Sequence, residues 1–499
     1  MKQLQTLLLC LLLPLAAFAS AWDEAKYKQI EKSIRVPVFA DRTFDITKYG
    51  ASLKATPAQN QKAINKAIEA CSKAGGGRVV IPAGTWQTGA LRLKSHVNLV
   101  IEKGATLFFA FDRALYPLVE TRWEGLDCIN YSPLIYAYKE TDIAITGEGT
   151  IDGNGSDETW WLMSGKTPKS RDIVVEEKQQ NPGGRADLLK MAEDGVPLEK
   201  RVFGPKKGLR PQMVNLNQCD GILIEGVTMV RSPFWVMHPL LSKNITVRNV
   251  TVHNDGPNGD GCDPESCENV LIENCVFDTG DDCIAIKSGT EDTPNRQVCE
   301  RIIISNCHFL HGHGGVVLGS EMSGGIRNVV VSSCVFYETD RGIRLKTRRG
   351  RGGTVEGIQL NNLVMEKVMC PFVFNMYYFC GANGKMKHVW DKAPYPVTDA
   401  TPCLRDVVIS DVRARQGTAC AGFFYGLAEM PVEGVKMQNV VVEMVDGAPG
   451  RPAMMDGCPE MQRAGFYLRN AADVDLRDVA VRGVQGDWLD ADDSVQLTA

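Results

Sequence analysis

Two aspartates stand side by side in the stretch FDTGDDCIAIKSG, residues 277–289. Asp281 and Asp282 precede the apolar residues 284–286, a pattern typical of a buried or half-buried strand. Adjacent carboxylates repel each other and lose hydration on burial, so folding alone does not favour them at such a place. Crowded like charges raise the pKa of at least one carboxyl group, and acid–base catalysis by two carboxyl groups uses such a difference. The pair is therefore the centre of a candidate catalytic site.

A short repeat surrounds this pair from residue 222 onward. Apolar residues alternate, one small or polar turn residue follows, and the alternation then resumes. The regular intervals between turn residues run from 23 (226 to 249) to 32 (274 to 306), with two longer ones of 49 and 39. This period, without helical segments between the strands, predicts an all-β, right-handed parallel β-helix, a solenoid in which each rung pairs with the next. The turn residues are Gly226, Asn249, Asn274, Asn306, Ser333, Asn362, Asp411, Asn439 and Asp478.

The segments that flank the repeat complete a predicted single catalytic domain over residues 22–499. Thr56 and Pro57 form a helix N-cap and first turn, and an apolar stripe follows, so we expect a helix over about 57–73 that covers the first rung. Residues 156–210 break the repeat and include a charged helical piece, so we expect a large loop beside a cleft. A second excursion spans 380–403.

The repeat places six polar residues at similar phase on four successive rungs. Because neighbouring strands are about 4.8 Å apart, these side chains are expected to line a strip roughly 15 Å long. We also expect the glycines beside them, at 259, 261, 280, 312, 314 and 342, to let a ligand approach the backbone. The six residues, in chain order, are Asp260, Asp281, Asp282, His313, Arg344 and Lys346.

Four ordered motifs carry a resemblance to a known family. The chain resembles glycoside hydrolase family 28, the polygalacturonases, which are right-handed parallel β-helices, over about residues 40–480. Gly259 and Leu345 replace the family's threonine and isoleucine, and neither change removes a catalytic group. The matching motifs are Asn258-Gly259-Asp260, Gly280-Asp281-Asp282, Gly312-His313-Gly314 and Arg344-Leu345-Lys346.

The resemblance implies hydrolysis of α-1,4-galacturonosidic bonds in pectin or polygalacturonate, by inversion and without a cofactor or metal. It makes Asp281 the general acid, Asp260 and Asp282 the pair that activates water, and His313 a support for the acid. An inverting pair is expected to be about 6.5–9.5 Å apart. The residues implied in binding substrate are Arg344, Lys346, Asn258 and Tyr378.

Several alternatives remain open from the sequence. Exo action is favoured because the two excursions could close one end of a groove. Hydrolysis of rhamnogalacturonan or xylogalacturonan is the main alternative; a calcium-dependent pectate lyase and a non-catalytic β-helical adhesin are others, since clustered acids also bind Ca²⁺. Six of the eleven residues from 341 to 351 are basic, which suits either a solvated face or a groove for a polyanion.

The first 21 residues have the pattern of a secretory signal peptide: Lys2, a short apolar core and small residues at a cleavage site. The net charge of −5 argues against a nucleic-acid partner. We therefore expect an exported protein, periplasmic or extracellular, that acts on an acidic plant cell-wall polysaccharide. No later segment suits a membrane span, and we expect a monomer.

Sixteen cysteines occur, and removal of Cys10 with the signal peptide leaves an odd number, fifteen. Cys275, Cys307 and Cys334 follow turn residues, so we interpret them as a buried column of small apolar side chains. Cys283 and Cys299 lie on either side of the polar loop in the longest regular rung, which runs from 274 to 306. A disulfide between them, at a place comparable to a bridge in the family, would contribute about 3 kcal/mol.

Overall fold

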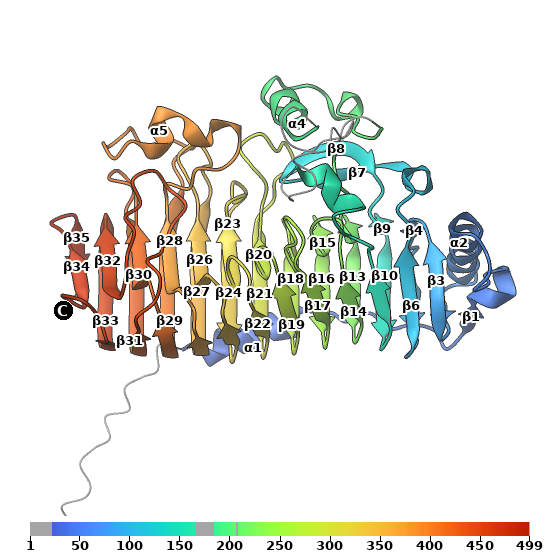
Figure 1. Ribbon diagram of the computed structural model, residues 1–499, viewed down its shortest axis with the longest axis horizontal. Helices are drawn as coiled ribbons and strands as arrows, with labels where there is room; N and C mark the ends of the chain where they lie inside the picture. The colour runs from blue at the N-terminus through green and yellow to red at the C-terminus, as the bar shows by residue number, and fades with distance from the viewer. Residues whose placement is uncertain (1–21, 166–183, 206–207, 499) are drawn as a thin grey trace, which may run out of the picture.

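Parallel strands stack along one axis for almost the whole length of the molecule (Figure 1). The structure is a computed structural model that describes residues 22–165, 184–205 and 208–498, so the predicted signal peptide lies outside the described residues. The largest sheet of the described part forms two adjoining arms of each rung. Its strands are β1 (Thr43–Asp45), β2 (Gly77–Ile81), β3 (Gly84–Thr88), β5 (Val97–Ile101), β6 (Ala105–Phe109), β10 (Thr141–Gly147), β11 (Thr150–Asp152), β13 (Asp220–Glu225), β14 (Thr228–Val230), β16 (Lys243–Arg248), β17 (Thr251–Asn254), β18 (Glu268–Glu273), β19 (Val276–Thr279), β21 (Cys299–Ser305), β22 (His308–Leu310), β24 (Ile326–Ser332), β25 (Val335–Tyr337), β27 (Thr354–Glu366), β29 (Cys403–Gly417), β31 (Val432–Met444), β33 (Ala471–Arg482) and β35 (Val495–Leu497).

A third face, which we call the site face, closes the solenoid. Its two sheets are joined through Cys262, which bridges to Met237 on one side and to Ile284 on the other. This face confirms the predicted parallel β-helix. Its strands are β4 (Leu91–Arg92), β9 (Ile135–Tyr138), β12 (Val214–Asn217), β15 (Met237–Leu240), β20 (Ile284–Ile286), β23 (Val316–Gly319), β26 (Arg341–Lys346), β28 (Cys370–Asn375), β30 (Cys420–Tyr425), β32 (Ala464–Arg469) and β34 (Leu489–Ala491).

All nine predicted turn residues have a positive φ, between 51° and 79°. Asn274, for example, joins β18 to β19 with φ of 54°. Glycine, asparagine and aspartate adopt this left-handed conformation more readily than other residues, which explains their use at the corner between the two arms. The repeat seen in the sequence is therefore the corner of each rung.

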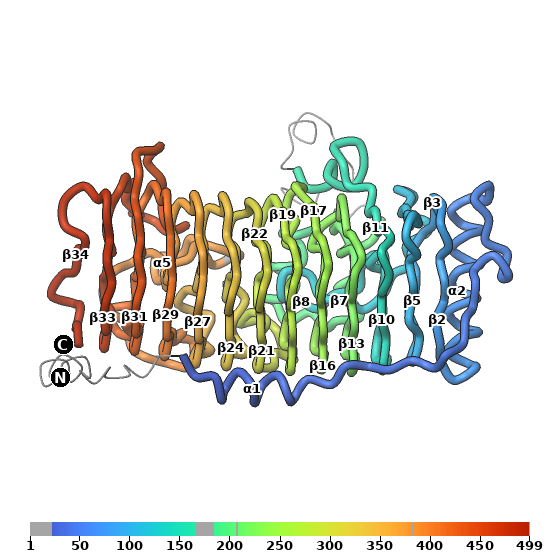
Figure 2. The backbone as a smooth tube through the Cα atoms, turned by 90° about the horizontal axis from the view of Figure 1, so that it is seen from below, coloured from blue at the N-terminus to red at the C-terminus, as the bar shows by residue number. Residues whose placement is uncertain are grey.

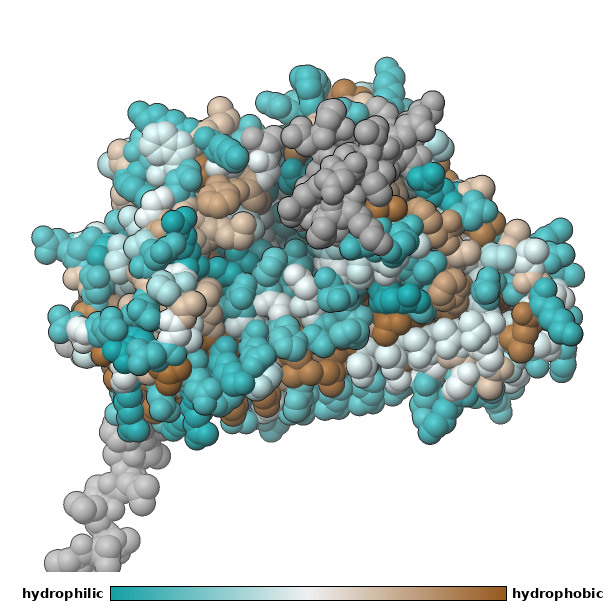
Figure 3. Space-filling model, in the orientation of Figure 1, coloured by the Kyte–Doolittle hydropathy of each residue, from teal (hydrophilic) through white to brown (hydrophobic). Residues whose placement is uncertain are grey.

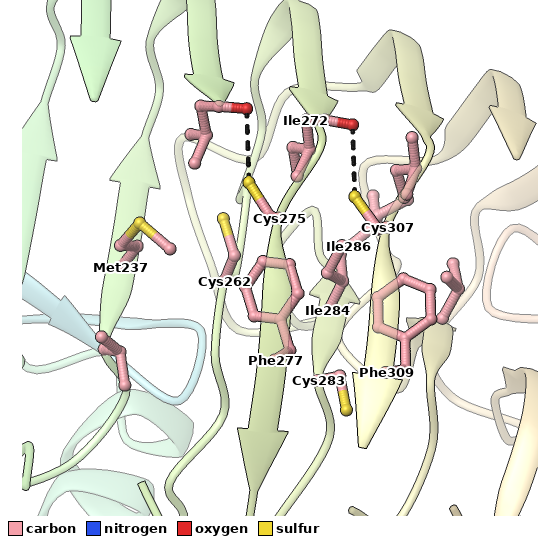
Figure 4. Close-up of a cluster of buried hydrophobic side chains, with 14 of the residues drawn as sticks. Met237, Cys262, Ile272, Cys275, Phe277, Cys283, Ile284, Ile286, Cys307 and Phe309 are labelled. Carbon is pink, nitrogen blue, oxygen red and sulfur yellow. Dashed lines mark hydrogen bonds between the residues drawn. The ribbon is translucent and has the colours of Figure 1, made fainter. Parts of the chain in front are cut away.

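Buried cysteines and aromatic rings fill the interior in columns along the axis (Figure 4). Cys275 and Cys307 are fully buried, and their thiols donate to carbonyl oxygens of the preceding rung, that of Cys307 to Ile272 O at 3.7 Å. Phe277 and Phe309 stack with ring centroids 5.9 Å apart. The interpretation of this column as apolar packing agrees with these contacts.

The predicted disulfide between Cys283 and Cys299 is wrong. All fifteen cysteines of the described residues are free thiols. Cys283 Sγ donates to His311 O at 3.2 Å, whereas Cys299 Sγ donates to Pro264 O at 3.5 Å. Both thiols point into the buried core toward different neighbours, so neither spans the loop between them.

Helices cover the ends and the edge of the solenoid. α2 (Pro57–Lys73) caps the first rung as predicted, with a capping box between Thr56 and Gln59. α1 (Glu24–Ser33), which the sequence analysis missed, lies along one long edge and buries Ile30 against Ile303 and Val330 (Figure 2). No helix within the described ranges is long and apolar enough to cross a membrane. The remaining helical pieces are η1 (Ile46–Tyr49), η2 (Arg113–Leu115), η3 (Trp160–Ser164), α4 (Gly184–Glu193), η4 (Leu198–Lys200), η5 (Ala382–Lys385) and α5 (Lys387–Trp390).

Two raised groups of segments stand above the site face (Figure 1). One contains α4, within the predicted insertion, and the antiparallel hairpin of β7 (Leu118–Trp123) and β8 (Leu126–Tyr131), which was not predicted. The other contains η5 and α5 of the predicted excursion 380–403. The buried ion pair of Arg122 with Glu265, at 3.1 Å, fixes the hairpin to the site face.

Candidate active site

Four successive rungs of the site face bring the six predicted residues together. Asp260 lies two residues before Cys262, Asp281 and Asp282 lie just before β20, and His313 lies just before β23. Arg344 and Lys346 project from β26, in register with Val317 and Gly319 of β23. The carboxylates therefore sit where the chain enters the site face, and the two cations sit on the strands beside them.

The three carboxylates are closer together than expected. One oxygen from each of Asp260, Asp281 and Asp282 lies within 4.8 Å of the others. The expected separation of about 6.5–9.5 Å is therefore not found between these oxygens, because Asp281 and Asp282 are adjacent and Asp260 is one strand spacing away. Three carboxylates at this distance could hold a metal cation. The side chains of Lys287, Arg344 and Lys346 already supply positive charge to them.

Asp282 is held as a carboxylate by two of these cations. Its Oδ2 lies 2.7 Å from Lys346 Nζ, and its Oδ1 lies 3.4 Å from Arg344 Nη1. Burial acts to raise the pKa of Asp282, but Lys346 and Arg344 outweigh it, so the pKa lies below its ordinary value. Arg344 Nη2 is buried and has no hydrogen-bond partner among the described residues.

Asp281 has a different partner. His313 Nδ1 lies 3.1 Å from Asp281 Oδ1, and the hydrogen bond between them raises the pKa of His313. The main chain fixes this pair, because His313 N donates to Asp281 O at 3.0 Å. Two neighbouring residues thus have opposite surroundings: Asp282 is buried between cations, while Asp281 is partly exposed beside an imidazole.

Asp260 is nearly buried, with 4% of its surface exposed. Burial, with the nearby carboxylates of Asp263 and Asp281, raises its pKa well above the ordinary value. Lys287 Nζ lies 3.9 Å from Asp260 Oδ2 and opposes this effect. Lys287 was not predicted as a site residue, although it lies in the stretch that contains the paired aspartates.

The two other predicted binding residues also lie at the site. Asn258 Oδ1 accepts a hydrogen bond from Arg210 Nη2 at 2.9 Å, and Arg210 Nη1 donates to Pro257 O at 2.6 Å. The Tyr378 ring lies under both cations, with its centroid 5.4 Å from Arg344 Cζ and 5.2 Å from Lys346 Nζ. Arg210 therefore orients Asn258, and Tyr378 supports the cation pair.

The glycines near these residues do not make room for a ligand, contrary to expectation. A Cβ on Gly280 would lie 2.5 Å from Asp255 O, and one on Gly261 would lie 2.5 Å from Cys283 O. A Cβ on Gly314 would lie 3.1 Å from Asp282 Oδ1. These glycines allow close packing of neighbouring rungs within the protein.

The other arginines of the basic run have structural partners. Arg348 and Arg351 both pair with Glu291, and Arg349 pairs with Glu429. They are at most 5% exposed, so they do not form a solvated face, but Arg348 and Arg351 line the pocket together with Lys346. Within the described residues the His311 ring pairs with Asp278 and Glu338, and not with the three clustered carboxylates.

A pocket of about 390 Å³ opens above these groups between the two raised groups of segments. Figure 3 shows hydrophilic residues between the two raised parts of this face. Arg185 of α4 enters the wall and pairs with Glu124 of the β7–β8 turn at 2.7 Å. The wall residues from both raised groups are Glu124, Leu126, Arg185, Leu189, Phe379, Cys380, Gly381 and Asn383.

A parallel β-helix with clustered aspartates in a polar pocket is the architecture of a polysaccharide-cleaving enzyme. The model of glycosyl hydrolases family 28 matches residues 203–462, which is 260 of the 499 residues, and the chain belongs to this family. It is therefore a glycoside hydrolase, which removes the lyase and adhesin alternatives.

Similar proteins are polygalacturonases by name. The chain is 30% identical over 410 residues to a probable polygalacturonase of Vitis vinifera, covering 79% of this chain and 73% of that protein. It is 30% identical over 393 residues to an exo-poly-alpha-D-galacturonosidase of Dickeya chrysanthemi, covering 74% and 62% respectively. The crystal structure of a hyperthermoactive exopolygalacturonase from Thermotoga maritima matches with a TM-score of 0.79 and 34% identity, over 92% of this chain and 96% of that one.

Proposed function

We propose that this protein hydrolyses α-1,4-galacturonan from a chain end. The observation that carries this proposal is the division between Asp281 beside His313 and Asp282 between Arg344 and Lys346. A glycosidase needs one carboxyl group that gives a proton and another that stays ionised. The names of the similar proteins support galacturonan as the substrate.

The surroundings of each carboxyl group suggest its role. Asp281 protonates the glycosidic oxygen, and the protonated His313, with Nδ1 3.1 Å from Asp281 Oδ1, supplies the proton that Asp281 passes on. Asp282 and Asp260 hold the attacking water between them. We expect inversion, with Asp260 and Asp282 as the pair that holds and activates the water.

The cations and the tyrosine suit a substrate that carries a carboxylate. Arg344 and Lys346 lie on one face of β26, and Lys346 lines the pocket, so this pair of cations can attract one galacturonate carboxylate. Asn258 and Tyr378 border the same pocket and complete the proposed binding site. A neutral sugar offers these cations nothing equivalent.

Exo action follows from the walls of the pocket. The paired Arg185 and Glu124 on one side, and Gly381 and Asn383 on the other, limit how far a polymer could extend along the site face. Rhamnogalacturonan and xylogalacturonan remain the alternative substrates within the family. Action on a cell-wall polymer also suits export to the periplasm or the outside of the cell.

Product analysis tests this proposal. The protein should release a single small product from polygalacturonate from the earliest time point, with slow loss of viscosity, and the product should first have the inverted anomeric configuration by ¹H NMR. Early oligomers of mixed length would contradict exo action. Faster release from rhamnogalacturonan or xylogalacturonan than from polygalacturonate would contradict the substrate.

A further inference from the structure

A buried lysine that the proposed mechanism does not use faces the catalytic carboxylates. Lys287 directly follows β20 and is 3% exposed. Its main chain is fixed on both sides, since Lys287 N donates to Pro264 O at 2.9 Å and Ser266 N donates to Lys287 O at 2.8 Å. Its ammonium group therefore has a defined place in the wall of the pocket.

Three neighbours hold the ammonium group at this place. Glu321 Oε2 lies 3.3 Å from Lys287 Nζ, and Asp260 Oδ2 lies 3.9 Å from it. The ring of Trp235 lies beneath it, with its centroid 4.6 Å from Nζ. The lysine thus lies between a structural carboxylate, a catalytic carboxylate and an aromatic face.

More carboxylates than cations surround Lys287. Asp263 and Asp282 also attract Lys287, and burial with the surrounding carboxylates raises the pKa of Asp263 as it does that of Asp260. The buried His238, whose pKa is lowered by burial, adds no charge at neutral pH. Arg344 and Lys346 pair with Asp282, so Lys287 is the cation that contacts Asp260 among the described ion pairs.

Glu321 shares its charge with other cations. Arg351 Nη2 lies 3.9 Å from Glu321 Oε1, and Arg351 and Lys346 help Lys287 to lower the pKa of Glu321 to about 2 although burial acts in the opposite direction. Glu321 is therefore ionised at every working pH. Glu321 holds Lys287 in place. It also competes with Asp260 for interaction with the ammonium group of Lys287.

We propose that Lys287 is a positioning residue of the active site: its ammonium group, anchored by Glu321 and Trp235, opposes protonation of Asp260 and so favours the ionised form that can hold the attacking water. Lys287 does not contact the sugar in this role. The inference rests on the proposed function for the role of Asp260, but the charge relationship itself does not depend on any activity.

The pH profile of kcat/KM on polygalacturonate tests this role. The acidic limb reports groups that must be ionised in the free enzyme. Lys287→Met removes the charge and keeps the length, so the limb should move to higher pH by at least about one unit, since charges about 4 Å apart interact strongly at a buried site. Lys287→Arg should keep the limb near that of the wild type. Glu321→Gln should move the limb in the opposite direction, to lower pH, because Lys287 then faces Asp260 alone.

Lys190→Met is the matched control, because Lys190 is an exposed lysine of α4 paired with Asp194. The acidic limb of the pH profile of Lys190→Met, and the activity of this variant, should equal those of the wild type. Equal losses at every pH in Lys287→Met and Glu321→Gln would overturn the inference and indicate a structural role alone. A rise in KM without a shifted limb would also overturn it and assign Lys287 to the substrate.

A direct titration separates this inference from the proposed function. The ¹³C-carboxyl signal of Asp260, assigned with Asp260→Asn, should titrate at higher pH in Lys287→Met than in the wild type. Identical titration in the two proteins overturns the inference whether or not the enzyme is active. A shifted titration in a protein that does not cleave galacturonan would support the charge relationship and contradict the proposed function.

Discussion

The ammonium nitrogen of Lys346 lies 2.7 Å from Oδ2 of Asp282, within a pair that is almost completely buried. Lys346 is therefore already paired with Asp282 before any substrate binds. A galacturonate carboxylate that binds Lys346 must share it with Asp282, which couples substrate charge to the ionisation of the catalytic group.

Lys346→Ala should lower kcat/KM on de-esterified galacturonan by roughly 10- to 150-fold, because a charge-assisted hydrogen bond contributes about 1.5–3 kcal/mol. The methyl ester lacks the carboxylate, so the wild-type enzyme should be poor on it and the variant should lose little more. Steady-state kinetics on both substrates measures this. Equal losses on acid and ester would mean that Lys346 acts only on Asp282.

Asp281→Asn should lower kcat by several orders of magnitude while KM changes little, since the near-isosteric amide has no proton to give. An aryl galacturonide with a good leaving group needs protonation less, so its loss should be much smaller. Comparison of the two substrates checks the role of Asp281. The same loss on both would exclude it as the acid.

The ion pair of His313 with Asp281 should make stability depend on pH. Because Asp281 raises the pKa of His313 in the folded state, the pair stabilises the protein fully below the ordinary histidine pKa near 6.5, and this contribution is lost as pH rises through the raised value. Urea unfolding of wild type and His313→Gln should therefore differ most at pH 5.5 and least at pH 8.5.

His311→Gln is a useful companion to that experiment. His311 pairs with Asp278, which also raises its pKa, so its removal should give a similar pH-dependent loss of stability. Activity should stay at the wild-type level, because the His311 ring pairs with Asp278 and Glu338 and not with the three clustered aspartates. A stability difference for His313→Gln that grows toward alkaline pH would contradict the assigned sign.

Arg210 should act on catalysis through Asn258. Arg210 is fully buried, and Arg210→Lys keeps the charge but loses the fork that bonds Pro257 O and Asn258 Oδ1. The free energy of unfolding should fall by about 1–3 kcal/mol. In a double-mutant cycle with Asn258→Ala, the losses in kcat/KM should be clearly less than additive; additive losses would show that Arg210 does not act through Asn258.

Thiol titration checks the cysteine assignment. The protein unfolded without reductant should show at least fifteen thiols per chain, and reductant should leave the unfolding temperature unchanged. In the native state, reaction should be limited mainly to Cys380 and Cys403, which are partly exposed. The sulfurs of Cys370 and Cys420 lie 3.3 Å apart, which is too far for a disulfide bond. A count of thirteen would indicate one disulfide.

The sequence predicted what depends on the repeat and missed what depends on contacts between distant segments. Asn274 and the other corner residues could be recognised because left-handed backbone selects a few residue types. The phase of the repeat then placed Asp260, Asp281 and His313 on neighbouring rungs. Their separation could not be predicted so well, because a loop residue such as Asp260 is not bound by the strand spacing alone.

Lys287 and the β7–β8 hairpin show the other limit. Lys287 directly follows an apolar strand, and this pattern is also typical of an exposed lysine at the end of a strand. Its burial depends on its ion pair with Glu321, which lies in a loop more than 30 residues later in the sequence. The β7–β8 hairpin lies before the regular repeat begins, so the spacing of the repeat could not predict it. The glycines were misread because their neighbours belong to other rungs, which a single stretch of sequence does not reveal.

The proposed catalytic groups come from successive rungs, and main-chain hydrogen bonds between rungs help to fix how far apart these groups lie. The walls of the pocket come from segments that leave the solenoid between strands, such as the β7–β8 hairpin and the excursion after β28. Insertions at these positions can lengthen or shorten without moving the strands beneath them. The reaction and the choice of polymer are therefore separable during evolution: loop length can change which chains enter, while the rungs keep the chemistry.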